Sequence, residues 1–260
     1  MTIRVAVAGA TGKLGSVVVR LIEHAADLEL VAALDSRSEL TELLGADVVF
    51  DTTLPGVSQR IVDFAVSNGM NVVIGTSGWS SARIAELEQR VREHEGLGVI
   101  VVPNFSLGSA LATAFSTVAS RFYDSIEIIE SHGAGKLDSP SGTAVRTAEL
   151  IGAARAERGP VAAPHIDQRA RGQQVASVPI HSLRMQGIVA KQQIVFGGPG
   201  EVLTITHDTS GSTAYEAGIL VAVRAAPGTV GVRVGLDTLI DLGLSTPAAT
   251  SSIPTVRETE

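Results

Sequence analysis

The segment SHGAGKLDSPSGTA, residues 131–144, contains side chains that acid catalysis and anion binding require. His132 is its one side chain that ordinarily titrates near neutral pH, so it is the natural proton donor. Lys136, four residues later, adds a full positive charge beside it. The spacing predicts catalytic roles for His132 and Lys136, with the alternative that Asp138 pairs with Lys136 and neutralises it.

The second half of this segment predicts a helix that begins at an anion site. Pro140 fixes φ, and Ser139 or Ser141 can cap the helix that follows. Gly142 and Thr143 then present backbone N–H groups to a carboxylate, which the helix dipole also stabilises. We expect Ser141, Gly142 and Thr143 to bind an anionic substrate; the alternative is a turn that only joins a strand to a helix.

A glycine-rich loop, GATGKLG at residues 9–15, predicts a dinucleotide site. It separates an apolar run from a helical pattern, and glycine there lets the backbone approach a pyrophosphate. Asp35 ends the next strand about 20 residues later, where an acid binds the adenosine ribose. The alternative is a tight turn without a ligand, because the glycine spacing departs from G-x-G-x-x-G. The candidate cofactor contacts are Gly9, Ala10, Thr11, Gly12, Lys13, Leu14 and Gly15.

The sequence leaves the choice of cofactor open. Asp35 favours NADH because its charge repels a 2′-phosphate, whereas Arg37 and Lys13 would attract one. Arg37 is equally well interpreted as a solvated loop charge. We therefore expect NADH and/or NADPH, with Asp35 and Arg37 beside the adenosine.

Two further segments, GTSG at 75–78 and PNFS at 103–106, each follow an apolar strand. Ligands of doubly wound sheets lie at the carboxyl ends of the strands, so backbone groups there would hold a nicotinamide ring. Either segment alone would be read as ordinary turn chemistry. The candidate residues are Gly75, Thr76, Ser77, Pro103, Asn104 and Phe105.

The elements that position these residues follow from the apolar pattern. In the first half, β-branched runs alternate with helical patterns, which predicts a parallel sheet covered by helices on both faces. The expected strands are 3–8, 28–35, 47–53, 71–78 and 98–104.

The pattern changes after about residue 105 and predicts an α+β unit. We expect VPIHSLRM, QQIVFG and EVLTITHD to form antiparallel strands, because they alternate and short turns join them. The other expected elements are helices at 106–122, 141–155, 213–226 and 235–242, a strand at 126–131, and a long loop at 158–178.

Composition excludes several classes of function. A net charge of −7 and a pI near 5.4 argue against a nucleic-acid partner. The chain has no cysteine and no closely spaced histidine pair, so we expect neither a thiolate nucleophile nor a metal site. Without an apolar run of about 18 residues or a secretory signal, the expectation is a soluble cytoplasmic protein with no membrane partner.

Six segments together resemble the dihydrodipicolinate reductase family: GATGKLG, GTSG, VPNFS, ESHGAGKLDSPSGTA, VPIHSLR and FGGPGEVLTITHD. Their order and spacing match the family over nearly all of residues 1–242. The resemblance implies an α/β fold: an N-terminal Rossmann domain, residues 1–105 plus 214–244, and an α+β domain, residues 106–213, for substrate binding and homotetramer formation. We expect residues 245–260 to be a disordered tail.

The resemblance also implies an activity. The family reduces the dehydrated imine of 4-hydroxy-tetrahydrodipicolinate, a cyclic dicarboxylate, with NADH or NADPH in diaminopimelate and lysine biosynthesis. Hydride adds to carbon 4 of the ring, and an acid protonates carbon 3. His132 falls on the family's proposed acid, Lys136 on its substrate-binding lysine, and Gly142 and Thr143 on its carboxylate-binding amides.

Several positions depart from the family pattern. Gly133 replaces a second histidine that helps to bind a substrate carboxylate, although we keep it among the expected substrate contacts. Thr52 replaces an aromatic residue near the cofactor, and Ser212 replaces a cation. A lost charged hydrogen bond costs about 1.5–3 kcal/mol, or about ten- to a hundred-fold in affinity. Gly133 therefore predicts weaker substrate binding.

Two alternatives remain open at the level of sequence. The chain could reduce another carboxylated imine or ketone, or it could be a non-catalytic NAD(P)H-binding paralogue. Retention of His132 and Lys136 argues against the paralogue. A semialdehyde dehydrogenase of similar architecture needs a cysteine nucleophile, which this chain lacks.

Overall fold

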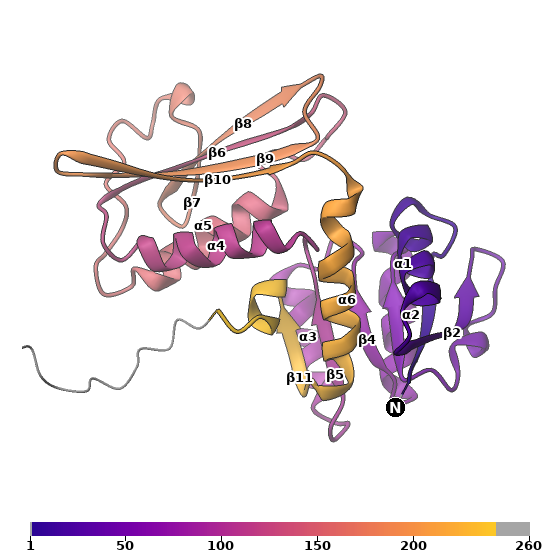
Figure 1. Cartoon of the computed structure of the whole chain (residues 1–260). Coiled ribbons are helices and arrows are strands. Elements are labelled where there is room, and N and C mark those ends of the chain that lie inside the picture. Colours follow the sequence, from indigo (N-terminus) through magenta and orange to yellow (C-terminus); the bar gives the residue numbers. More distant parts are fainter. Residues whose placement is uncertain (1, 243–260) are drawn as a thin grey trace, which may run out of the picture.

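The computed structural model describes residues 2–242 of the 260-residue chain, and two sheets organise them (Figure 1). The first sheet is parallel throughout, with strand order β11-β5-β4-β3-β1-β2. This arrangement confirms the predicted Rossmann-type α/β fold. The strands are β1 (Ile3–Ala8), β2 (Leu28–Leu34), β3 (Val48–Asp51), β4 (Asn71–Ile74), β5 (Gly98–Val101) and β11 (Gly231–Val234).

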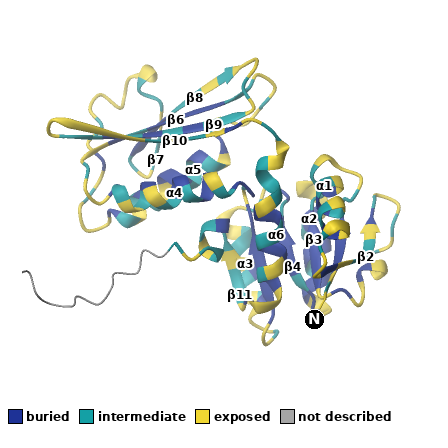
Figure 2. Ribbon diagram, in the orientation of Figure 1, coloured by how far each residue is buried: buried dark blue, intermediate teal, exposed yellow. Residues whose placement is uncertain are grey.

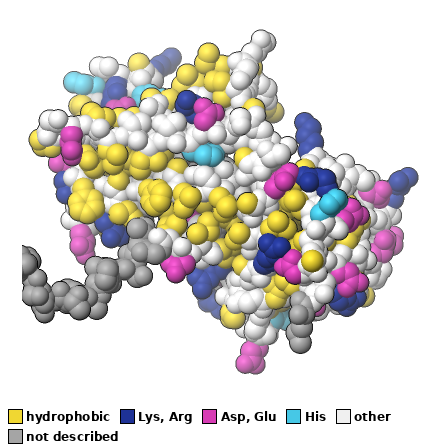
Figure 3. All heavy atoms as spheres, in the orientation of Figure 1, with side chains coloured by type: hydrophobic (Ala, Val, Ile, Leu, Met, Phe, Trp, Pro, Cys, Tyr) yellow, Lys and Arg dark blue, Asp and Glu magenta, His cyan; other side chains and the backbone are white. Residues whose placement is uncertain are grey.

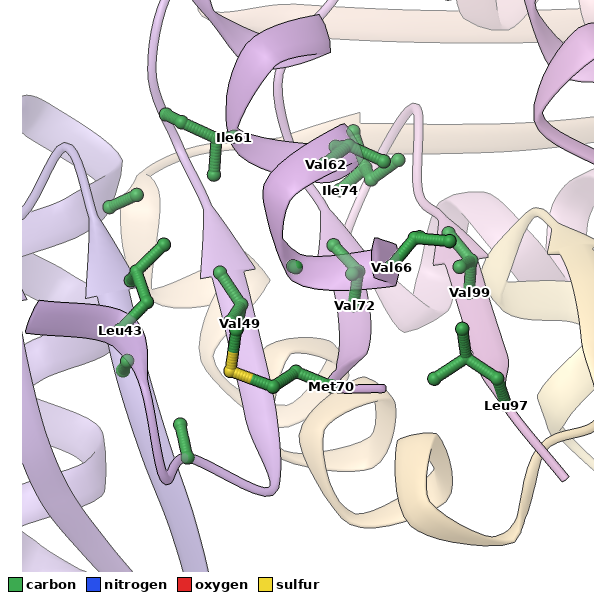
Figure 4. Packing of buried hydrophobic residues seen from close by; sticks show 14 of the residues in the cluster. Leu43, Val49, Ile61, Val62, Val66, Met70, Val72, Ile74, Leu97 and Val99 are labelled. Carbon is green, nitrogen blue, oxygen red and sulfur yellow. The ribbon is translucent and has the colours of Figure 1, made fainter. Parts of the chain in front are cut away.

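Helices cover both faces of the parallel sheet and bury its apolar strands. On one face, α2 (Pro55–Ser67) and α3 (Ser81–Val91) pack against alternate strand residues. On the other face, α1 (Lys13–His24) and α6 (Glu216–Ala225) do the same. Figure 4 shows α2 presenting apolar side chains to β4 and β5. Because both faces are buried, the strands read as near-continuous apolar runs.

The second sheet has strand order β10-β9-β6-β8-β7. Two helices, α4 (Leu107–Ala119) and α5 (Gly142–Ala154), pack on one of its faces, and no described α-helix covers the other (Figure 1). The burial colours show a buried layer between the sheet and these helices (Figure 2). The strands are β6 (Ser125–Gly133), β7 (Gln173–Val175), β8 (Val178–Met185), β9 (Ala190–Gly198) and β10 (Glu201–Thr209).

The alternation of β6 decides which of its side chains face the helices. Ile126 and Ile128 are buried in the core with α5, and Glu130 follows with a fully buried side chain. Side chains alternate along a strand, so His132 lies on the same face as Glu130. The apolar core of this sheet thus leads directly into the predicted catalytic segment.

The chain crosses between the two sheets twice, from β5 into α4 and from β10 into α6. The short 3₁₀ turn Ser212–Tyr215 precedes α6, and the other 3₁₀ turns of the described residues lie at Leu40–Leu43, Arg169–Arg171, Ala226–Gly228 and Leu236–Leu239. The two crossings bring the carboxyl ends of β4, β5 and β11 close to the start of α5, where one cavity joins them. No helix within residues 2–242 combines the length and apolar character needed to cross a membrane.

The strands expected at 47–53, 71–78 and 98–104 end earlier, at Asp51, Ile74 and Val101. Four other predictions of elements were also wrong in part. VPIHSLRM forms β8, but β8 pairs with β6 in parallel, because the long connection carrying α5 crosses over between them. The expected loop 158–178 contains β7, which pairs with β8. The strand expected at 126–131 continues to Gly133, so His132 is on the strand.

The fourth error concerns residues 235–242, which we expected to be helical. Only the 3₁₀ turn Leu236–Leu239 forms there. Gly235 has φ of 92°, and the Thr238 hydroxyl bonds to the Gly235 carbonyl at 2.8 Å, which closes a single turn. The predicted disordered tail, residues 245–260, lies outside the described residues.

Candidate active site

A cavity of about 460 Å³ lies between the carboxyl edge of the parallel sheet and the start of α5. The loops that follow β4 and β5 form one wall, as expected for a doubly wound sheet. The end of β6 and the first turns of α5 form the other wall. Of the predicted residues, the cavity brings together Gly75, Thr76, Ser77, Pro103, His132, Lys136, Ser141, Gly142 and Thr143.

The glycine loop before α1 is packed too tightly for side chains. Gly9 has φ of 83°, and a Cβ atom there would lie 2.7 Å from the carbonyl oxygen of Thr52. A Cβ atom on Gly15 would lie 2.0 Å from the Gly9 carbonyl oxygen. Gly12 is the N-cap of α1 and supplies no side-chain cap, so the first N–H groups of α1 remain available to an anion.

A second groove, of about 380 Å³, runs beside this loop between β1, β2 and α2. Asp35 lines it and pairs with Arg37 at 3.1 Å. The backbone N–H of Arg37 and then its guanidinium hold the pKa of Asp35 below its ordinary value. Asp35 therefore remains an anion and a hydrogen-bond acceptor at neutral pH. Arg60 of α2 also lines this groove, and no feature of the sequence pointed to it.

A dinucleotide whose adenosine lies in this groove would place its nicotinamide end at the cavity. Thr76 is buried and lines the cavity, and its hydroxyl oxygen has no hydrogen-bond partner among the described residues. An orphaned hydroxyl beside a tight glycine loop and an available helix N-terminus fits a bound dinucleotide. Trp79, the one tryptophan of the sequence, lines the same cavity and donates to the Ser58 hydroxyl at 2.9 Å.

His132 is held by a buried carboxylate that the sequence analysis missed. Its Nδ1 lies 2.5 Å from Oε2 of Glu130, whose side chain is fully buried. Arg184 of β8 donates to both oxygens of Glu130, at 3.0 and 2.9 Å. Burial raises the pKa of Glu130, but hydrogen bonds from Arg184, Ser182 and His132 outweigh it and hold that pKa below its ordinary value.

Lys136 lies in the loop after β6 and forms an ion pair with Asp138 at 2.7 Å. The predicted alternative that these two residues pair is thus what the structure shows. The hydrogen bond from Lys136 holds the pKa of Asp138 below its ordinary value, so Asp138 is ionised at neutral pH. Both residues line the cavity, and the Lys136 side chain is 29% exposed.

Helix α5 begins at the cavity with a side-chain cap. The Ser141 hydroxyl accepts from the backbone N–H of Ala144 at 3.3 Å. The first helical bond runs from Val145 to the Ser141 carbonyl, so Gly142 and Thr143 precede the hydrogen-bonded turns. Their N–H groups and the positive end of the helix therefore face a cavity that Lys136 also lines.

The remaining predicted residues take other places. Gly133 ends β6 outside the lining of the cavity, and a Cβ atom there would lie 3.2 Å from the Ile188 carbonyl oxygen. Phe105 is buried and stacks on Phe50 at 5.4 Å. Asn104 accepts from the backbone N–H of Ser106. Gly9, Thr11, Gly12 and Asp35 line the second groove; Ala10, Lys13, Leu14, Gly15 and Arg37 do not.

The sequence analysis missed two residues at the site, Glu130 behind the cavity and Arg146 in its wall, for different reasons. Glu130 could have been found, because it precedes His132 by two positions on an alternating strand. Arg146 of α5 lines the cavity and donates to the Val234 carbonyl at 2.7 Å and to Asp237 at 3.2 Å. Its partners lie about ninety positions along the chain, so only the fold reveals this contact.

Comparisons with known proteins agree on one family. The family model for the N-terminus of dihydrodipicolinate reductase matches residues 3–105, and the model for its C-terminus matches residues 106–240. A 4-hydroxy-tetrahydrodipicolinate reductase of Clavibacter sepedonicus is 62% identical, covering 98% of this chain and 92% of the relative. One from Streptomyces griseus is 42% identical, covering 92% of this chain and 98% of the relative.

Solved structures agree with the sequence matches. A dipicolinate-bound dihydrodipicolinate reductase from Paenisporosarcina sp. TG-14 superposes with a TM-score of 0.79 at 30% identity, covering 92% of this chain and all of that one. An apo scyllo-inositol dehydrogenase from Lactobacillus casei, at 13% identity and a TM-score of 0.61, shares the fold alone.

Proposed function

The chain belongs to the dihydrodipicolinate reductase family, and from this premise we propose the role of each cavity residue in its reaction. The enzyme reduces the dehydrated imine of 4-hydroxy-tetrahydrodipicolinate with NADH or NADPH, a step of diaminopimelate and lysine biosynthesis. The observation that carries the proposed roles is that His132, Lys136 and the start of α5 share one cavity with the loops after β4 and β5.

The residues that would hold the dinucleotide lie along the carboxyl edge of the parallel sheet. The glycine loop and the start of α1 bind the pyrophosphate, and Asp35 accepts from the adenosine ribose. Thr76 and the backbone around Pro103 contact the nicotinamide end. When bound, the reduced cofactor supplies the hydride. The full set of proposed cofactor contacts is Gly9, Ala10, Thr11, Gly12, Lys13, Leu14, Gly15, Asp35, Arg37, Gly75, Thr76, Ser77, Pro103, Asn104 and Phe105.

Lys136 and the start of α5 hold the dicarboxylate. The Lys136 ammonium attracts one carboxylate, while the N–H groups of Gly142 and Thr143 donate to it. The Ser141 cap fixes where these N–H groups point. Gly133, at the end of the neighbouring strand, offers only backbone, so the site binds its substrate with one side chain fewer than the family pattern.

His132 delivers the proton. Glu130 is ionised and can only accept, so Nδ1 of His132 donates to it and Nε2 is the nitrogen left for the cavity. In the imidazolium form, Nε2 gives its proton to the ring carbon next to the one that receives hydride. Such general-acid catalysis contributes about 10²–10⁴-fold to the rate.

Binding of a planar dicarboxylate tests the substrate site apart from turnover. Trp79 is the one tryptophan and lies in the cavity wall, so its fluorescence reports occupancy. We expect dipicolinate to quench it, and K136A to weaken dipicolinate binding about ten- to a hundred-fold through the lost charged contact. NADPH binding should change less than twofold. Unchanged dipicolinate affinity in K136A would remove Lys136 from the proposed site.

We also propose how the chain is organised in space and in the cell. The division into residues 1–105 plus 214–244 and residues 106–213 follows the two sheets, although 243 and 244 lie outside the described residues. The open face of the second sheet exposes Leu183, Met185 and Val202, which supports its use in a homotetramer. The need for NAD(P)H supports a cytoplasmic location.

A further inference from the structure

The carboxylate of Glu130 lies behind the cavity and contacts several residues of the proposed site. Besides Nδ1 of His132 and the guanidinium of Arg184, it accepts from the backbone N–H of Ser141 at 3.2 Å. Ser141 is the N-cap of α5, the helix whose N-terminus faces the cavity. One fully buried carboxylate thus joins the proposed acid on β6 to the proposed anion site on α5.

Arg184 extends this network to the loop that carries Lys136. One of its terminal nitrogens donates to the carbonyl oxygen of Asp138 at 2.6 Å, and the other donates to the Leu183 carbonyl. In the pairing of β6 with β8, Arg184 lies directly opposite His132. The guanidinium is therefore fixed by the sheet register, and through Asp138 it fixes the loop of Lys136.

We propose that Glu130 and Arg184 are positioning residues for the reductase reaction, holding His132, the Lys136 loop and the start of α5 in one arrangement. This inference rests on the proposed function, because it assigns the proton transfer to His132. Neither residue lines the cavity, so neither acts on the substrate directly. Their effect on the reaction passes through the residues that they hold.

The ionised state of Glu130 gives His132 a defined orientation and charge. A carboxylate accepts but does not donate, so it selects the N–H at Nδ1 and stabilises the imidazolium that the reaction needs. The direction of the Glu130 pKa, below its ordinary value, agrees with this role. Glu130→Gln removes the negative charge but keeps a hydrogen-bond acceptor for His132. It therefore separates the effect of the charge from the effect of the hydrogen-bond geometry.

Other charged groups also face His132. Arg184 lies opposite it on β8, and Lys136 and Asp138 line the cavity from the following loop. Arg146 and Glu149 line the cavity from α5, which packs against β6. Changing Glu130 to Gln leaves the ionisable group of each of these residues in the protein, so the only charge that the substitution removes is that of the Glu130 carboxylate.

The chain offers a matched control on the same strand. Glu127 of β6 also accepts from one histidine and one arginine, His181 at 2.7 Å and Arg171. It lies on the opposite face of the sheet from Glu130, because the two positions are three apart on a strand. Glu127→Gln therefore removes an equivalent charge from a similar network that does not touch the cavity.

The kinetic test compares Glu130→Gln with Glu127→Gln in the full-length enzyme. We expect E130Q to lower kcat about ten- to a hundred-fold, with KM for NADPH within twofold, and E127Q to leave kcat within twofold. The alkaline fall of the kcat–pH profile should move to lower pH in E130Q, because the imidazolium loses its counter-charge. Wild-type kcat and an unmoved profile in E130Q would overturn the proposal.

Two safeguards keep the test decisive. If E130Q does not fold, R184K keeps the charge but loses the two-pronged contact, and it should lower kcat with unchanged NADPH binding. Wild-type kcat in a folded R184K would contradict the role of Arg184. NADPH quenching of Trp79 verifies folding in each variant.

Nitrogen-15 NMR of histidine-labelled protein, with the His132 signals assigned by their loss in H132N, reads the network without turnover. We expect a slowly exchanging Nδ1 proton in the wild type and in E127Q, and its loss in E130A. Identical His132 signals in E130A and wild type would overturn the proposal even if the enzyme reduces a different substrate. Absent turnover with an intact Nδ1 signal would instead contradict the proposed function alone.

Discussion

At the scale of single residues, the site divides into groups that line the cavity, which we propose to contact the substrate, and groups that hold them. His132 and Lys136 line the cavity, whereas Glu130 and Arg184 lie behind it. Lys136 is already paired with Asp138, so an incoming carboxylate shares the ammonium with that side chain. The positive helix end at Gly142 adds a second attraction for that carboxylate.

The most specific prediction at this scale concerns His132. Replacement by alanine should lower kcat about a hundred-fold or more, because the reaction loses its proposed general acid. Dipicolinate and NADPH should both still quench Trp79. Steady-state kinetics with the two fluorescence titrations measure these effects, and a variant with the wild-type rate would show that the proton comes from elsewhere.

Much of this site was predictable from the sequence because its motifs are local. The glycine loop, His132, Lys136 and the start of α5 each lie within a short stretch whose chemistry can be read directly. Arg184 could not be found in this way, because it meets Glu130 across 54 positions of the chain. That contact depends on β8 pairing with β6 in parallel, and the sequence predicted an antiparallel arrangement.

At the scale of elements, the start of α5 combines a helix cap with the proposed anion site. Its N-cap Ser141 satisfies one helix N–H through its hydroxyl and donates its own N–H to Glu130. The first bond keeps the helix end in shape, and the second ties that end to β6. The expected helix 141–155 was close to the observed one because the Ser-Pro-Ser-Gly pattern marks its beginning clearly.

A pair of cap variants separates the effect of a helix cap on stability from its proposed effect on substrate binding. S141A should lower the free energy of unfolding by about 1 kcal/mol and raise KM for the substrate, because the helix end loosens at the cavity. S106A removes the equivalent cap from α4, where the Ser106 hydroxyl accepts from Ser109. It should cost similar stability and leave KM within twofold. Urea unfolding measures the stability of each variant, and substrate titration measures its KM. Equal KM values in S141A and S106A would contradict a binding role for the α5 cap.

At the scale of the whole molecule, the cavity lies where two differently built sheets meet. The loops that follow β4 and β5 of the parallel sheet form one wall of the cavity, where we propose that the cofactor binds. The proposed acid, His132, and the proposed substrate-binding residue, Lys136, come from the end of β6 in the second sheet and from the loop that follows it. Arg146 of α5 fastens the junction to β11 through the Val234 carbonyl. Apolar side chains cover much of the side surface along α4 and α6 (Figure 3). The open face of the second sheet is the surface assigned to assembly.

The tetramer prediction is tested by a charge placed on that open face. Val202 is 69% exposed on β10, and V202D should lower the native mass from tetramer toward smaller species. Val230, 68% exposed beside β11, gives a control of equal exposure on the other sheet. Light scattering after gel filtration measures both. If V230D lost the tetramer and V202D kept it, the assignment of assembly to the open face of the second sheet would be wrong.

The central claim is that this cavity reduces the dehydrated imine of 4-hydroxy-tetrahydrodipicolinate. The most direct measurement is oxidation of NADH and NADPH at 340 nm by the purified enzyme, with that substrate generated in situ. We expect turnover that depends on the substrate and yields tetrahydrodipicolinate. Failure to oxidise either cofactor, while Trp79 still reports that both bind, would contradict it.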